Sequence, residues 1–153
     1  MVAGWDLLLS TLGAAIVSAF VPLVNAEVLT LGAVAIAPPH LDFPCVLMVT
    51  LGQMMGKVVL FLVGRGSLKV PWMVKTGKIE EAAKRFGMGG SLGGAVLAVS
   101  ALTGIPPFYL ISLACGLFGF SLPRFVVIGS AGRLVRFSLI GVFPLLFQEL
   151  FLG

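Results

Sequence analysis

Charged side chains are scarce in this sequence: only 10% of its 153 residues are Asp, Glu, Lys or Arg, while 59% are hydrophobic. A soluble domain carries charged residues at about a quarter of its positions, so this composition excludes an ordinary soluble protein. The chain is therefore predicted to be an all-α integral membrane protein. Its length allows one membrane domain, residues 1–153, without an appended catalytic domain.

Cysteine and histidine are almost missing, with two cysteines and one histidine in the whole sequence. Cys45 and Cys115 lie in apolar stretches without a partner at motif spacing, which favours small core residues over a disulfide or a metal site. His40 stands beside Asp42 without a second ligand, so no metal is expected. Because no nucleophile-and-base pattern or phosphate-cradling glycine loop is visible, neither an enzyme nor a cofactor is predicted.

Two uninterrupted apolar stretches are each long enough to cross a membrane. Residues 43–64 and 125–147 contain 22 and 23 residues, whereas a hydrocarbon core of ~30 Å needs about 20 helical residues. The first stretch holds Lys57, and the second holds Arg133 and Arg136. Both are predicted to be transmembrane helices.

Two further apolar stretches are interrupted near their middles. Residues 7–37 are broken at Pro22, Asn25 and Glu27, and residues 91–122 are broken at Pro106 and Pro107. Proline ends a helix because it lacks a backbone donor. At 31 and 32 residues, each stretch is too long for one straight span and too short for two, which need about 40. Each is predicted to form a re-entrant or broken hairpin, and the alternative is four ordinary helices with two of them kinked.

The two halves of the sequence resemble each other. GKVVLF at residues 56–61 matches GRLVRF at 132–137 in four of six positions when Lys and Arg are counted as alike, and SAFVP at Ser18 parallels SALTGIPP at Ser100. Each half therefore consists of a hairpin followed by one spanning helix, with repeat one at about 7–66 and repeat two at about 91–150. One crossing per half predicts an inverted repeat, which many transporters use. Chance similarity in apolar sequence is the alternative.

Positive charge collects in the connector between the repeats, residues 67–90, and just before it. The cations of residues 65–90 are Arg65, Lys69, Lys75, Lys78, Lys84 and Arg85. The positive-inside rule predicts that residues 65–90 are cytoplasmic, with both chain ends and the His40 turn outside. Apolar residues at helical spacing around Ile79 predict a short interfacial helix with Thr76 as its cap and Trp72 as an anchor. A solvated linker is the alternative.

Four ionisable residues are predicted at membrane depth: Glu27, Lys57, Arg133 and Arg136. Each costs about 2.5–3.5 kcal/mol at the centre of a membrane helix, so they should face the protein interior and pair. We expect Glu27 to pair with Arg133, leaving Arg136 free for a ligand. Three cations against one carboxylate favour an anionic ligand such as a lipid phosphate. The alternative is that Lys57 or Arg136 snorkels to an interface while the remaining charges only hold helices together.

The predicted translocation site combines these charges with the broken backbone of both hairpins. Its residues are Glu27, Arg133, Arg136, Lys57, Asn25, Pro22, Pro106 and Pro107.

The order of three motifs between about Ser18 and Phe137 is similar to that of a known family. They are VPLVNAE, then LGQMMGKVVLFLVGRG, then SALTGIPPFYLISLACGLFGFSLPRFVVIGSAGRLVRF. The chain resembles a short member of the DedA family, also called the VTT or SNARE-associated membrane protein family. The sequence departs from it at Ala101 and Leu102, where larger members carry arginines, and at Gln53 and Lys57, where an acid is common. The resemblance implies movement of lipids or lipid carriers between leaflets by scrambling or flipping.

The predicted function is therefore that of a lipid or lipid-carrier scramblase or flippase. Its expected partners are membrane lipids, including an anionic phospholipid or a polyprenyl phosphate, and not nucleic acid, and a homo-oligomer is left open. The predicted location is the inner membrane of a bacterium. A non-transporting scaffold, whose basic connector recruits a partner or anionic lipid, is the alternative, and an intramembrane enzyme is a third, less favoured one.

Overall fold

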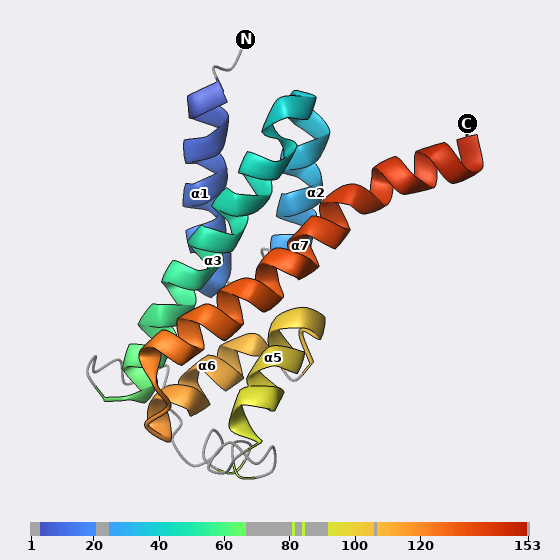
Figure 1. The fold of residues 1–153 in the computed structure, drawn as a ribbon. Helices are drawn as coiled ribbons and strands as arrows, with labels where there is room; N and C mark the ends of the chain where they lie inside the picture. Colours follow the sequence, from blue (N-terminus) through green and yellow to red (C-terminus); the bar gives the residue numbers. More distant parts are fainter. Residues whose placement is uncertain are drawn as a thin grey trace. The chain divides into compact units, whose positions relative to one another are not determined.

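The computed structural model describes residues 4–20, 25–66, 81, 84, 92–105 and 107–152, with the backbone alone for residues 144–152. Every regular element in these ranges is a helix (Figure 1). The elements are α1 (Gly4–Phe20), α2 (Ala26–Ile36), the 3-10 turn η1 (Pro39–Leu41), α3 (Asp42–Gly64), α5 (Gly93–Thr103), α6 (Phe108–Leu117) and α7 (Leu122–Leu152). The predicted all-helical class is confirmed for the described part of the chain.

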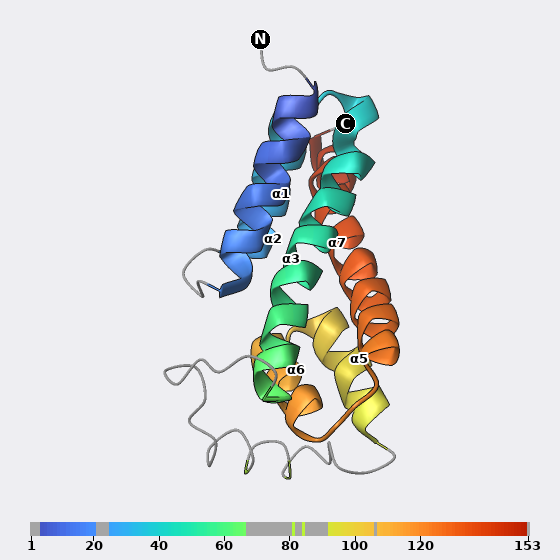
Figure 2. The same ribbon diagram turned by 90° about the vertical axis from the view of Figure 1, so that its left-hand side faces the viewer.

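The first interrupted stretch contains two helices, α1 and α2, which contact each other (Figure 1, Figure 2). Asn25 caps α2, since its side chain accepts a hydrogen bond of 2.9 Å from the backbone N–H of Glu27. Glu27 in the first turn suits the positive end of the helix dipole. The helix stops at Ile36 because Pro38 and Pro39 follow.

The second interrupted stretch contains two helices, α5 and α6, which contact each other. Gly104 ends α5 with a left-handed φ of 77°, and its N–H bonds to the carbonyl oxygen of Ser100. Only glycine adopts this conformation without steric cost. Pro107 then stands immediately before the first residue of α6. The predicted break in residues 91–122 is therefore confirmed.

Within the described residues, two helices are long and apolar enough to cross a membrane, as judged by length and composition. The first candidate span, Pro39–Gly64, includes α3, whose bounds differ by one residue from the predicted stretch 43–64. The second, Leu122–Phe143, lies in α7, which begins three residues before the predicted stretch and continues to Leu152. Of the predicted connector helix, the structure describes Glu81 and Lys84, which are helical and exposed. Thr76, Ile79 and Trp72 lie outside the described residues.

The chain divides into two compact units, and both long helices contribute to each of them. Unit 1 contains residues 1–54 and 133–153, so it holds α1, α2, the first part of α3 and the later part of α7. Unit 2 contains residues 55–132, so it holds the rest of α3, α5, α6 and the start of α7.

In unit 1, small residues let the helices approach closely. A Cβ atom on Gly52 of α3 would lie 2.6 Å from the Cβ of Ala15 and 2.8 Å from the carbonyl oxygen of Leu12, both on α1. Beside this contact, the buried residues Ala15, Val46, Val49 and Phe137 form a core shared by α1, α3 and α7. Glycine at position 52 therefore brings α1 and α3 close together.

Unit 2 is packed in the same way. A Cβ atom on Gly132 of α7 would lie 2.6 Å from the Cβ of Ala101 on α5. Gly116 of α6 leaves no space for a side chain against the backbone of Phe61 on α3. The rings of Phe61 and Phe125, both fully buried, have centroids 4.9 Å apart. Aromatic packing and backbone contact at glycine together fix the four helical segments of this unit.

Candidate functional site: a polar cluster in unit 1

The described residues of the predicted site are divided between the two units. Asn25, Glu27, Arg133 and Arg136 belong to unit 1. Lys57 and Pro107 belong to unit 2. Pro22 and Pro106 lie outside the described residues. The site that can be described is therefore a cluster within unit 1.

Arg136 of α7 forms an ion pair with Glu27 of α2. The two side chains keep 21% and 38% of their surface exposed, so this pair is reachable from outside the unit. The prediction that Arg136 is the free arginine is wrong, because the carboxylate of Glu27 meets Arg136, one turn beyond the expected partner Arg133. Two residues three positions apart differ by about 60° around a helix axis, so the two arginines can meet different neighbours.

Arg133 points its guanidinium toward α3. Its Nη1 donates a hydrogen bond of 3.1 Å to Oε1 of Gln53, and its guanidinium carbon lies 5.6 Å from the centroid of the Phe137 ring. The amide of Gln53, which is only 2% exposed, is shared with α1. Its Nε2 donates to the carbonyl oxygen of Ala15 at 3.1 Å and also to the hydroxyl of Ser18.

Gln53 belongs to this cluster but was not among the predicted site residues. It links α1, α3 and α7 through one amide that both donates and accepts. The available signal was an amide side chain in the middle of an apolar span, where a polar group needs an internal partner. Lys57, one turn further along α3, was included in the predicted site because its charge is visible in the sequence.

Gln53 and Arg133 both lie in the interior of the candidate spans. Gln53 is the fifteenth of the 26 residues of the span Pro39–Gly64. Arg133 is the twelfth of the 31 residues of α7. Their hydrogen bond therefore joins α3 and α7 well away from the ends of either helix.

Three other predicted site residues have a plainer local role or a separate location. Asn25 is exposed and caps α2. Pro107 is exposed and precedes α6, where a fixed φ favours the start of a helix. Lys57 is buried in α3 with 5% of its surface exposed, and it lies in unit 2.

The cluster in unit 1 carries a positive surplus. Glu27 supplies one negative charge against the two guanidinium groups of Arg133 and Arg136, while Gln53 and Ser18 are neutral. Arginine binds phosphate and carboxylate through paired hydrogen bonds, and Arg136 is the more accessible of the two. Chemically, the arrangement can bind an anion in exchange for Glu27.

Comparison with known proteins supplies no relative for this cluster. A scan against models of protein families, a search of curated proteins and a search of solved structures each found no match.

Proposed function

We propose that this chain is an integral membrane protein that moves lipids, or phosphate-bearing lipid carriers, between the two leaflets, as its resemblance to the DedA family implies. The observation that carries the proposal is the polar cluster among apolar helices, where Arg133 of α7 bonds to Gln53 of α3 and Arg136 pairs with Glu27 of α2. Ionisable groups at membrane depth are costly, and they mark transport pathways more often than structural contacts.

The lengths of three of the four hairpin helices support elements that enter and leave on one face. Helix α1 has 17 residues, about 25 Å at ~1.5 Å per residue. Helices α2, α5 and α6 have 11, 11 and 10 residues, which correspond to about 15–17 Å at ~1.5 Å per residue. That is roughly half of a ~30 Å hydrocarbon core. Such half-length helices suit re-entrant hairpins whose tips lie near the midplane.

Two observations support an inverted repeat. The hexapeptides 56–61 and 132–137 have similar burial, with the glycine and phenylalanine buried and the central valine exposed in both. Each unit contains one hairpin and a part of each long helix. An inverted repeat offers one site to both sides of a membrane in turn.

In the proposed mechanism an anionic headgroup displaces the carboxylate of Glu27 from Arg136. The side chain of Glu27 already has 38% of its surface exposed. Its released carboxylate can therefore be hydrated by water or pair with a neighbouring cation. Arg133, held by Gln53, keeps a second positive charge within one turn of the binding residue. The phosphate group of the lipid would thus pass the middle of the membrane next to the positive charges of Arg133 and Arg136, while the hydrocarbon chains of the lipid remain in the lipid phase.

The proposed location is a bacterial inner membrane, with residues 65–90 cytoplasmic as their cations favour. Anionic phospholipid or polyprenyl phosphate is the proposed cargo.

A leaflet-exchange assay in proteoliposomes tests the proposal. Vesicles containing a fluorescent anionic phospholipid would be compared for the wild type, Arg136→Gln, Arg133→Gln and the control Arg124→Gln. Arg124 is an exposed arginine at the start of the same helix. We expect the wild type and the control to exchange lipid faster than empty vesicles, and Arg136→Gln to lose at least about tenfold, because one charge-assisted hydrogen bond of 1.4 kcal/mol or more is removed. Equal exchange by all four proteins would remove the arginines from the mechanism and favour the scaffold.

A further inference from the structure

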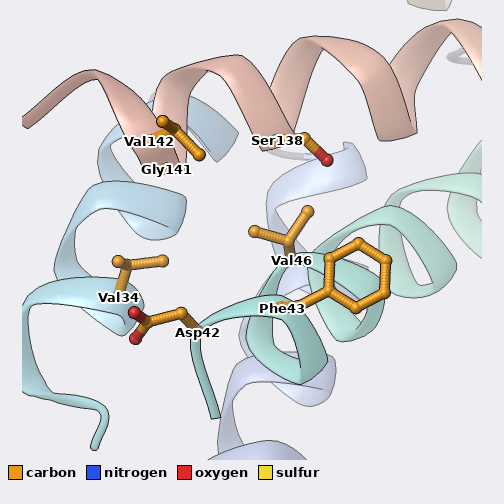
Figure 3. A pocket seen from close by; sticks show the side chains of 7 residues that line it. All are labelled: Val34, Asp42, Phe43, Val46, Ser138, Gly141 and Val142. Carbon is orange, nitrogen blue, oxygen red and sulfur yellow. The ribbon is translucent and has the colours of Figure 1, made fainter. Parts of the chain in front are cut away.

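Unit 1 contains an apolar pocket that the polar cluster does not use. It has a volume of about 160 Å³ and lies among α2, α3 and α7 (Figure 3). Its lining residues are Val34, Asp42, Phe43, Val46, Ser138, Gly141 and Val142. An apolar cavity of about 150 Å³ holds a benzene-sized group in other proteins. The pocket can therefore hold about six carbon atoms of a ligand.

One wall of the pocket comes from the start of a candidate span. Asp42, Phe43 and Val46 lie in the first two turns of α3, near the start of the span Pro39–Gly64. Ser138, Gly141 and Val142 lie within α7, which continues as a helix to Leu152. The start of a span is a membrane boundary, where lipid headgroups meet the hydrocarbon region.

The pocket reaches the outside of the unit. Phe43 and Val142 expose 58% and 46% of their surfaces. Glycine at position 141 keeps the pocket open, since a Cβ atom there would lie 3.3 Å from Val46 and 3.5 Å from Val34. A larger side chain at this position would occupy the space.

Two polar groups stand at this otherwise apolar pocket, Asp42 on α3 and Ser138 on α7 (Figure 3). Asp42 is half-buried at the start of α3. Its carboxylate makes no ion pair or hydrogen bond with a side chain in the described part of the chain. A carboxylate at the mouth of an apolar pocket complements a ligand that joins a cationic group to a hydrocarbon chain.

We propose that this pocket binds a lipid with an ammonium headgroup, whose hydrocarbon chain enters between Val34 and Val46 and whose ammonium group pairs with Asp42. The hydroxyl of Ser138 is placed to donate to the phosphate or ester oxygen of the same molecule. The inference rests on the membrane location in the proposed function, but not on lipid movement. It adds a binding site that recognises the ammonium group of a lipid, whereas Arg136 would take a phosphate.

Lipid retention tests this site without measuring transport. The protein would be placed in nanodiscs with equal amounts of phosphatidylethanolamine and phosphatidylglycerol of identical chains, then released into mild detergent for native mass spectrometry. The variants are Asp42→Asn and Gly141→Leu, with Asp6→Asn and Gly32→Leu as matched controls. Asp6 is another exposed acid of unit 1, and a Cβ atom on Gly32 of α2 would meet nothing within 4 Å.

We expect Asp42→Asn to lower the retained ratio of phosphatidylethanolamine to phosphatidylglycerol about fivefold relative to wild type, because a charge-assisted hydrogen bond is lost. Gly141→Leu should retain about one lipid fewer per chain than Gly32→Leu, because the pocket is filled. If Gly141→Leu does not fold, Ser138→Leu is the second variant, because it fills the pocket from another wall. An unchanged ratio in Asp42→Asn, or unchanged retention in both filled variants, would overturn the proposal. Neither result would bear on whether Arg136→Gln lowers leaflet exchange, because lipid retention and leaflet exchange are measured separately.

Discussion

At the scale of single residues, the ion pair of Glu27 and Arg136 makes a quantitative prediction. Removing one partner leaves the other charge uncompensated, so Glu27→Gln and Arg136→Gln should each lower the melting temperature in detergent. Because both side chains are partly exposed, we expect a loss of about 1 kcal/mol for each. The double variant should be more stable than the sum of the two losses by about 0.5 kcal/mol or more.

The control for this cycle is Arg124→Gln combined with Glu27→Gln, because Arg124 is exposed at the start of the same helix. Losses in this second pair should add. If the Glu27 and Arg136 losses also add, the two residues are not coupled, and the ion pair does not contribute to stability.

The candidate site could be predicted from the sequence only in part. Charge in an apolar stretch is visible in any sequence, so Glu27, Arg133 and Arg136 were found, and unit 1 contains all three. Their pairing was not visible, because it depends on the rotation of α7 about its axis. Gln53 was missed because a neutral amide stands out only when its partners, Arg133 and the carbonyl oxygen of Ala15, are known.

At the scale of the helices, glycines at the crossing points predict where substitutions are not tolerated. Gly52→Ala would place a Cβ atom 2.6 Å from Ala15, and overpacking of this kind costs about 1–3 kcal/mol. We expect a lower melting temperature for Gly52→Ala and partial recovery in the double variant with Ala15→Gly. Circular dichroism melts in detergent would measure both.

Gly13→Ala on α1 is the control for this substitution, since a Cβ atom there would meet nothing within 4 Å. Alanine has a higher helix propensity than glycine, so this variant should gain roughly 0.5–1 kcal/mol. Equal melting of Gly52→Ala and Gly13→Ala would show that α1 and α3 do not pack at position 52.

The helices themselves were largely predictable. Proline and glycine interrupt a helix by local chemistry, so the ends of α1, α2, α5 and α6 follow from Pro22, Pro38, Gly104 and Pro107. The bounds of α7 were less certain, because Leu122 and Pro123 begin a helix without a strong signal and the apolar pattern does not mark its start. Which glycines form crossing points also could not be predicted, since that depends on the tertiary contacts of Ala15 and Ala101.

At the scale of the whole molecule, the proposed topology predicts opposite exposure of two positions. Single cysteines would replace His40 and Lys84 in a background without Cys45 and Cys115. Both positions are exposed, and α3 lies between them. We expect an impermeant thiol reagent to label position 40 from outside the cell and position 84 only after the membrane is opened. Labelling of both from outside would contradict a single crossing by α3.

The hydrogen bond from Arg133 to Gln53 joins residues 80 positions apart, which has a consequence for biosynthesis. A chain made from its amino end completes Glu27 and Gln53 well before either arginine is translated. If the helices insert in that order, the acceptors already lie in the membrane when α7 arrives with Arg133 and Arg136. The segment with two arginines inside its apolar stretch, α7, thus inserts last, where Glu27 and Gln53 can already pair with them. A nascent chain stopped before Leu122 would hold these acceptors without their guanidinium partners.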